Sequence, residues 1–541
     1  MSELTIQQAF NLALEHHQAG RLQQAQQIYR QILVQQPAHV GAMHHLGVLA
    51  HQQGQNEAAA NLIRKALALS PDLPDAHNNL GTVLQCQGQI DEAIASYRHA
   101  LTLKSDFPNA LYNLAGALQR KGQMGEAISA YRQTIALLPT YVEAHNNLGI
   151  ALMDNGQVDE AIAAFGQTIA LSPKYAPPHS NLGNLLRSKR RFDEAIIAYR
   201  QAIALDPNLP EAHCNLGNSL KEKGLLDEAV AAYRRAIALR HNFAEAHTNL
   251  GNTLHVQQKL DQAIAAHRQA IQINPEFAPA HVGLANALRE KGQLEDAQRS
   301  LREALRLDPE SKQIAFEVAA LSGDNSVPKA PPTVVRKLFD EYAGHFDAHL
   351  VSALQYRGPE HLRSAIGSIT ARTDLGVLDL GCGTGLCGVE LRPMARRLVG
   401  VDLSPGMLER CAERKIYDEL IEGDITDVLL RRPAQWDLIV AGDVMVYVGD
   451  LTAVLSAASA ALRPDGWLAF TVERYEGTGF FLNTSFRYSH SLEYIRELAA
   501  CAGLDEVLTR ELTIRLQSNQ PVAGWVVVLR KRNAASPDCN V

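Results

Sequence analysis

Residues 143–173 read EAHNNLGIALMDNGQVDEAIAAFGQTIALSP, and this pattern recurs through more than half of the chain. Its central leucine, Leu148, has counterparts at intervals of 34 residues. The leucines in this context are Leu12, Leu46, Leu80, Leu114, Leu148, Leu182, Leu216, Leu250 and Leu284. A period of this length predicts stacked pairs of helices, in which each pair buries its apolar face against its neighbours.

Small residues and turn formers occupy fixed places in each repeat. Most repeats carry a glycine eight residues after the leucine, as at Gly88 and Gly156, which is expected to end the first helix in a left-handed conformation. Five residues further on, every repeat has an alanine, which lets the two helices of a pair approach closely. These positions resemble the tetratricopeptide repeat. The resemblance implies an all-α superhelix of nine repeats over residues 6–311, and we expect residues 312–321 to form a capping helix.

Two polar residues recur beside the leucine. A histidine three residues before it, as at His77, is expected to pack inside the repeat, because residues one repeat apart lie too far apart to share a metal ion. An asparagine stands one residue before it at Asn79, Asn113, Asn147, Asn181, Asn215 and Asn249. This pattern is similar to the superhelix of O-linked N-acetylglucosamine transferases, although no glycosyltransferase sequence follows it. The resemblance implies that the asparagines line a concave groove and hold a protein or peptide backbone; the alternative is hydrogen bonding between repeats.

The repeats are followed by SGDNSVPKAPP at residues 322–332, a composition that predicts a semi-rigid linker. Beyond residue 333 the pattern changes to strands that alternate with helices, and residues 532–541 are expected to form a flexible tail. The predicted strands cover residues 377–380, 398–401, 420–422, 436–441, 467–473, 506–513 and 524–529. This order predicts a seven-stranded α/β Rossmann-like domain with a parallel sheet and an antiparallel hairpin at one edge.

The first predicted strand runs into LDLGCGTG at residues 378–385, where alternate glycines let a cofactor lie close to the backbone. A GxGxxG pattern is also present in this loop, but alone it is weak evidence for a dinucleotide. Three acidic residues favour S-adenosylmethionine instead. Asp379 lies two residues before the first glycine, Asp402 ends the second predicted strand, and Asp424 follows the third.

This region resembles class I S-adenosylmethionine-dependent methyltransferases over residues 333–531. The resemblance implies S-adenosylmethionine as the cofactor. It implies a cofactor site made of Asp379, Gly381, Cys382, Gly383, Thr384, Gly385, Asp402, Leu403, Met407, Asp424, Ile425 and Asp443. In this site Asp402 would hold the ribose hydroxyls, Leu403 and Met407 would flank the adenine, and Asp424 would bind its amine.

Residues 338–350 resemble the lid helix of bacterial methyltransferases that carry tetratricopeptide repeats, which would place Tyr342 and His349 over the cofactor. The alternative is an amphipathic helix packed on the sheet edge. Asp443 and His490 are candidate catalytic bases, needed only if the acceptor arrives protonated. Substrate approaches this fold after the fourth and fifth strands, so the candidate substrate contacts there are Tyr447, Arg487 and Tyr488.

The composition limits the partners that we expect. A formal net charge of −7 with 20% charged residues argues against binding to nucleic acid or a membrane surface through bulk charge. No apolar run reaches the ~18 residues of a membrane-spanning helix. The seven scattered cysteines lack the spacing of a metal site and predict free thiols in the cytoplasm.

Three functions remain open from the sequence. The first is a methyltransferase that modifies a protein captured by its repeats. The second is a methyltransferase for a small-molecule or carrier-bound acid, docked to a complex through the repeats. The third is a non-catalytic scaffold, which the intact motif set disfavours. The acceptor atom and the oligomeric state are left open.

Overall fold

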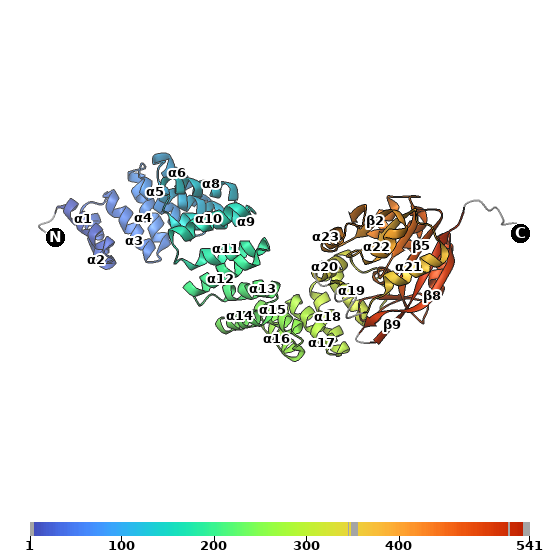
Figure 1. Ribbon diagram of the computed structural model, residues 1–541. Coiled ribbons are helices and arrows are strands. Elements are labelled where there is room, and N and C mark those ends of the chain that lie inside the picture. The colour runs from blue at the N-terminus through green and yellow to red at the C-terminus, as the bar shows by residue number, and fades with distance from the viewer. Residues whose placement is uncertain (1–4, 344–345, 348–354, 518–519, 534–541) are drawn as a thin grey trace. The chain divides into compact units, whose positions relative to one another are not determined.

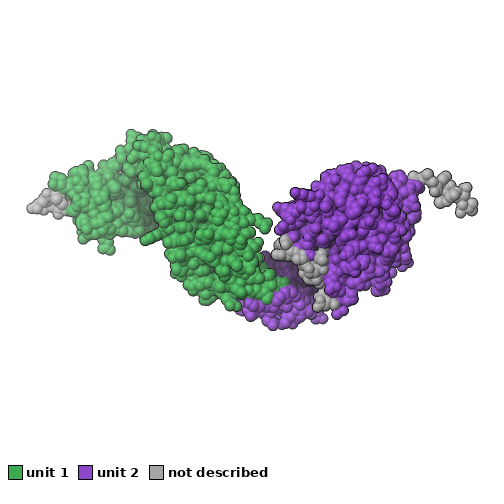
Figure 2. All heavy atoms as spheres, in the orientation of Figure 1, with its two compact units in different colours: residues 1–257 green, residues 258–541 purple. Residues whose placement is uncertain are grey.

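The structure is a computed structural model that describes residues 5–343, 346–347, 355–517 and 520–533. The chain divides into two compact units, residues 1–257 and residues 258–541 (Figure 2). This division falls between two helices of one repeat, not at the predicted end of the repeats near residue 311. The second unit therefore holds the last repeat helices together with the sheet.

The first unit consists of paired helices that lie side by side along the chain (Figure 1). They are α1 (Ile6–Gln18), α2 (Leu22–Gln35), α3 (Val40–Gln52), α4 (Asn56–Leu69), α5 (Pro74–Cys86), α6 (Ile90–Leu103), α7 (Pro108–Arg120), α8 (Met124–Leu137), α9 (Val142–Asp154), α10 (Val158–Leu171), α11 (Ala176–Ser188), α12 (Phe192–Leu205), α13 (Pro210–Glu222), α14 (Leu226–Leu239) and α15 (Ala244–Val256).

The predicted glycine roles in the repeats are confirmed. Gly88 and Gly156 end the first helices of their pairs with φ of 78° and 75°. Arg190 and Gln258 replace this glycine in two repeats and also adopt positive φ, at 58° and 61°. A Cβ added to Gly81 would lie 2.6 Å from the ring of Tyr97, so the glycine lets the ring pack close to the backbone of the paired helix.

Partly exposed ion pairs recur with the 34-residue period of the repeats. Arg98 pairs with Glu126 at 2.7 Å, and the same pair recurs one repeat later as Arg132 with Glu160 at 2.6 Å. All four side chains are about half exposed, so each pair contributes less than ~1 kcal/mol. Apolar packing between neighbouring pairs therefore supplies most of the stability of the stack.

The second unit begins with helices that continue the repeats and ends in the α/β region. Its helices are α16 (Leu260–Ile273), α17 (Ala278–Glu290), α18 (Leu294–Leu307), α19 (Lys312–Ser322), α20 (Pro332–Tyr342), α21 (Gly358–Ile369), α22 (Leu386–Leu391), α23 (Pro405–Glu413), α24 (Ile425–Leu430), α25 (Thr452–Ala461) and α26 (Leu492–Cys501). No helix in the described ranges has both the length and the apolar character needed to cross a membrane.

One sheet runs through the second unit. Its described strands are β1 (Leu375–Leu380), β2 (Ala395–Asp402), β3 (Glu419–Glu422), β4 (Trp436–Ala441), β5 (Leu462–Arg474), β6 (Phe480–Leu482), β7 (Tyr488–His490), β8 (Leu504–Gln517) and β9 (Gln520–Lys531). The order is β3-β2-β1-β4-β5-β7-β6, with β1 to β5 parallel, and β9 pairs antiparallel with both β5 and β8. The predicted α/β fold and edge hairpin are confirmed.

The sheet holds the seven predicted strands and two short strands, β6 and β7, that the sequence prediction did not include. Each spans only three residues, which is too short for an alternating pattern to be recognised. The core lies on both faces of the sheet. One buried cluster joins Leu378 to α24, α25 and α26, and another joins its neighbour Val377 to α21 and α22.

Residues 322–332, predicted to be a linker, are instead attached to the α/β region. The backbone N–H of Ala330 donates to the carbonyl of Tyr447 at 3.0 Å, and that of Gly449 donates to the carbonyl of Pro328 at 2.9 Å. The side chain of Asn325 bonds to the backbone of Phe480 and Leu482. The prolines limit regular pairing, but they do not make this segment a free spacer.

Candidate functional site

A cavity of about 340 Å³ opens at the carboxyl ends of β1, β2 and β4. The predicted site residues that line it are Gly381, Cys382, Gly383, Thr384, Asp402, Leu403, Asp424, Ile425, Asp443, Tyr342, Tyr447 and Arg487. Its volume lies within the range of small-molecule sites. Three residues of the predicted cofactor site, Gly385, Asp379 and Met407, do not line it, and neither do Tyr488 and His490.

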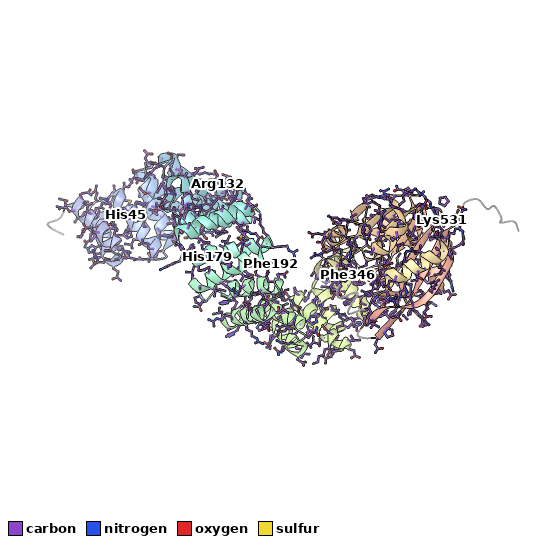
Figure 3. The ribbon with its side chains drawn as sticks, in the orientation of Figure 1. His45, Arg132, His179, Phe192, Phe346 and Lys531 are labelled. Carbon is purple, nitrogen blue, oxygen red and sulfur yellow. The ribbon has the colours of Figure 1, made fainter. Side chains whose placement is uncertain are left out.

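The loop after β1 is held open by glycines with left-handed backbone. Gly381, Gly383 and Gly385 have φ of 62°, 54° and 93°. A Cβ on Gly381 would lie 2.3 Å from Cγ2 of Val444, so no larger residue fits there. Among the described residues, a Cβ on Gly383 would meet only Phe346, at 3.8 Å, so the backbone at this glycine is open to the cavity. Figure 3 labels Phe346, which lines the cavity.

Asp402 connects the first two strands at the cavity edge. Its Oδ2 accepts the N–H of Gly383 and its Oδ1 accepts the N–H of Ser404, both at 2.9 Å. Burial raises the pKa of Asp402, and these N–H donors oppose the shift. Met407 follows in α23 and is fully buried under the cavity wall. The predicted contact between Met407 and adenine is therefore not supported by its position.

Asp379 lies beneath the loop and is fully buried. The hydroxyl of Tyr417 donates to its Oδ2 at 2.6 Å, while Oδ1 has no hydrogen-bond partner in the described part of the chain. Burial raises the pKa of Asp379 to about 7. No motif marks Tyr417, which precedes β3, and sequence reasoning missed it.

Asp424 begins α24 and caps it by accepting the N–H of Thr426 at 2.9 Å. Its Oδ2 accepts a hydrogen bond from Nζ of Lys329 at 2.6 Å. Burial alone would raise the pKa of Asp424, but the ion pair with Lys329 holds it below the usual value. The sequence placed Lys329 in a linker and gave no sign that it lines the cavity.

Asp443 lies among arginines. Its backbone has φ of 57°, and its oxygens accept from Nη1 of Arg487 at 3.0 Å and from Nη1 of Arg515 at 2.9 Å. Arg515, which is almost fully buried, also pairs with Glu473. Two guanidinium groups thus occupy the carboxylate of Asp443, which argues against its predicted role as a base. Arg515 was missed because the predicted strand ended two residues before it.

His490 and Tyr488 are both buried away from the cavity. Nε2 of His490 lies 2.9 Å from the carbonyl of Val448 and 3.1 Å from that of Gly449. Since carbonyls only accept, we assign the proton to Nε2. Burial lowers the pKa of His490 to about 4. The Tyr488 hydroxyl donates to the carbonyl of Val327 at 2.6 Å. The predictions of His490 as a base and Tyr488 as a substrate contact are therefore not supported, because both side chains stabilise the fold.

Aromatic side chains from α20 and the residues after it line the cavity. Phe339 lies 5.5 Å from Tyr447 and 6.0 Å from Phe346, and Tyr342 lies 5.5 Å from Phe346, as ring-centroid distances. Tyr342 thus stands where a lid residue is predicted, while His349 lies outside the described residues. Asp340 of α20 accepts from the Ser404 hydroxyl at 2.5 Å, which attaches the helix to the start of α23.

The comparisons with known families distinguish the helical repeats from the region that carries the cavity. A profile described as a methyltransferase domain matches residues 378–468, which include the glycine loop, Asp402, Asp424 and Asp443. Tetratricopeptide repeat profiles match residues 47–88 and 255–319, and a profile for the C-terminal domain of cilia and flagella-associated protein 70 matches residues 72–281. The chain carries tetratricopeptide repeats followed by a methyltransferase domain.

Curated relatives match the methyltransferase domain. The chain is 32% identical over 137 residues to malonyl-[acyl-carrier protein] O-methyltransferase of Serratia marcescens, covering 25% of this chain and 51% of that protein. It is 26% identical over 159 residues to ubiquinone biosynthesis O-methyltransferase of Bordetella avium, covering 26% and 65%. The chain thus spans about half the length of the first relative. The crystal structure of MamA is 25% identical and covers 30% of this chain and 95% of its own, with a TM-score of 0.29.

The asparagines of the tetratricopeptide repeats are half-buried and bond to the preceding repeat. The amide nitrogens of Asn113, Asn147 and Asn215 donate to Asn78, Tyr112 and Asn184 at 3.0, 2.9 and 3.0 Å. Asn79 with His44 and Asn249 with Asn218 make the same kind of contact, while Asn181 makes no such bond within the described residues. These bonds match the alternative that the sequence left open. A bound peptide would have to use the acceptor positions that remain on these amides, or displace the hydrogen bonds between the repeats.

The histidines of the repeats hydrogen-bond to the turn before their own helix. Nε2 of His77 lies 2.8 Å from the carbonyl of Pro71, and Nε2 of His145 lies 2.9 Å from that of Pro139. Each histidine thereby closes the turn that enters its own repeat.

Proposed function

We propose that the protein is an S-adenosylmethionine-dependent methyltransferase. The observation that carries this proposal is the arrangement of the open glycine loop, Asp402 and Asp424 around one cavity within the methyltransferase domain. The cavity offers carboxylates and open backbone to a cationic cofactor. Asp402 and Asp424 both line it, and among the described residues a Cβ on Gly383 would meet only Phe346, so the backbone there is open to a ligand. When bound, the cofactor would supply an activated methyl group.

The residues of the chain then have binding and shielding roles. Asp402 keeps lone pairs beyond those that accept Gly383 and Ser404, and these would accept the ribose hydroxyls. Asp424 would accept the adenine amine beside Lys329. The aromatic residues of α20 would exclude water. Alignment of an acceptor in such a site typically lowers a barrier by ~7–11 kcal/mol, so no strong base is required of Asp443 or His490.

The acceptor that we favour is a protein or peptide held by the repeats. Tetratricopeptide repeats bury their apolar faces against one another and leave long surfaces for such partners. The test is transfer of labelled methyl from S-adenosylmethionine into cell lysate, with the label separated into protein and small-molecule fractions. Asp402→Ala serves as the control. We expect label in protein bands with the unaltered chain and a loss of at least about 30-fold with the variant at subsaturating S-adenosylmethionine, because the variant loses ribose contacts worth ~2 kcal/mol.

An acid acceptor is the second candidate, and Arg487 favours it. This guanidinium lines the cavity, and within the described ranges only its Nη1 is hydrogen-bonded, to Asp443. Its other nitrogens suit a carboxylate oxygen. A relative named for malonyl-[acyl-carrier protein] fits the same chemistry. Label confined to the small-molecule fraction, or to a carrier protein through a base-labile ester, would support this candidate over the first.

A further inference from the structure

The turn between β6 and β7 has an unusual backbone at Phe486. Its φ is 64°, a left-handed conformation that is rare for a bulky residue. Within the turn, the N–H of Phe486 donates to the carbonyl of Asn483 at 2.9 Å, and the N–H of Asn483 donates to that of Arg487 at 2.8 Å. Such a conformation persists only where the surroundings hold it, so the contacts of the Phe486 ring become important.

Those contacts come from the last tetratricopeptide repeat and its capping helix. The guanidinium of Arg289, in α17, lies over the Phe486 ring at 4.5 Å from the centroid. Phe316, in α19, is fully buried and lies 6.0 Å from Phe486. Nε of Arg289 is buried without a hydrogen-bond acceptor in the described part of the chain. The stacked ring is therefore a principal partner of this guanidinium.

The residue after Phe486 is Arg487, which reaches the cavity. Its Nη1 bonds to Asp443, whose backbone also has positive φ, and its guanidinium lies 5.5 Å from the ring of Tyr447. The ring of Phe486 thus packs against the repeats, while the adjacent side chain lines the methyltransferase cavity. A change in the backbone at Phe486 would move Arg487.

We infer that the last repeat completes the acceptor site: Arg289 and Phe316 hold Phe486 in its left-handed conformation and thereby position Arg487 in the cavity. This inference rests on the proposed function, since Arg487 is assigned to the acceptor there. Arg289 and Phe486 are positioning residues that act through Arg487. The repeats then have a second role besides capturing a partner, because the methyltransferase domain without them would lack an ordered Arg487.

The test uses the full chain with Arg289→Ala and Phe486→Leu. Phe486→Tyr retains the ring and is the conservative rescue. Arg187→Ala is the matched control, because Arg187 has the equivalent position in an earlier repeat and its Nε is also buried without a hydrogen-bond partner among the described residues. Two readouts are measured for each protein. One is labelled methyl transfer into lysate as a function of S-adenosylmethionine concentration, and the other is the rate at which phenylglyoxal modifies Arg487, followed by peptide mass spectrometry.

We expect the maximal transfer rate to fall at least about tenfold in Arg289→Ala and Phe486→Leu, a change of about 1.4 kcal/mol. The half-saturating S-adenosylmethionine concentration should stay within about twofold, since the cofactor contacts are intact. Arg487 should react several times faster with phenylglyoxal in both variants. Phe486→Tyr and Arg187→Ala should behave like the unaltered chain.

Unchanged transfer and unchanged Arg487 reactivity in both variants would overturn the inference. So would an equal loss in Arg187→Ala, which would indicate a general effect of the repeats. If the unaltered chain transfers no label, the proposed function fails, and the reactivity of Arg487 still decides whether the last repeat positions it.

Discussion

The repeats and the methyltransferase domain differ in how often each stabilising contact occurs. In the repeats a contact such as Arg98 with Glu126 recurs one period later as Arg132 with Glu160. In the methyltransferase domain, a contact such as that of Gly383 with Asp402 is not part of a periodic series. A repeated contact is detectable in the sequence and tolerant of single losses. A contact made once is harder to detect, and its loss should remove a function.

The largest expected effect is at Gly381, where the methyltransferase domain has no second copy of the contact. In Gly381→Ala the added Cβ would lie 2.3 Å from Val444 in a backbone with φ of 62°. The loop must shift, so we expect affinity for S-adenosylmethionine to fall at least about 100-fold, or ~2.7 kcal/mol. Isothermal titration calorimetry measures this change. Affinity within threefold of the unaltered chain would show that the loop does not form the site.

The next effect concerns the buried Asp379, whose pKa of about 7 lies above the unfolded value near ~3.9. Folding favours the protonated form of Asp379. This group therefore adds to the free energy of unfolding below pH ~4, and that contribution is lost as the pH rises to about 7. In Asp379→Asn this decrease in the free energy of unfolding with rising pH, which is at most about 4 kcal/mol, should be absent.

Urea unfolding at several pH values, followed by tryptophan fluorescence, tests this prediction. The three tryptophans, Trp436, Trp467 and Trp525, all lie in strands of the methyltransferase domain, so the signal reports that region. Parallel pH profiles for Asp379→Asn and the unaltered chain would contradict the assignment.

A smaller and local effect is expected at Gly81 in the repeats. In Gly81→Ala the new Cβ would lie 2.6 Å from the ring of Tyr97, an overpacking that typically costs ~1–3 kcal/mol. Because repeats interact mainly with their neighbours, amide hydrogen exchange should accelerate in α5 and α6. Tryptophan-monitored unfolding and cofactor affinity should not change. A shift in either would show that the two regions are more strongly coupled than their contacts indicate.

The smallest effect is expected for the surface ion pairs. Arg98→Ala removes one pair whose side chains are about half exposed, and copies of the pair remain in other repeats. We expect a change in unfolding free energy below ~1 kcal/mol. A double-mutant cycle with Glu126→Ala measures the pair directly, and a coupling above 2 kcal/mol would refute the view that these pairs are minor.

The same contrast explains what the sequence could predict. The repeats, the glycine turns and the strand ends that carry Asp402 and Asp424 follow periodic or local patterns. The partners from distant positions do not: Lys329 reaches Asp424 across 95 residues, and Arg515 reaches Asp443 across 72. His490 follows a predicted strand end but faces the carbonyls of Val448 and Gly449, and no local pattern encodes that direction. Tertiary packing decided these positions.

The central claim is that the cavity of the methyltransferase domain binds S-adenosylmethionine through Asp402. Its most direct test is calorimetric titration of S-adenosylmethionine into the full chain and into Asp402→Ala. We expect one equivalent to bind the unaltered chain and the affinity to be at least about 30-fold weaker in the variant, which is ~2 kcal/mol. No binding to the unaltered chain, or equal affinity for both proteins, would contradict it.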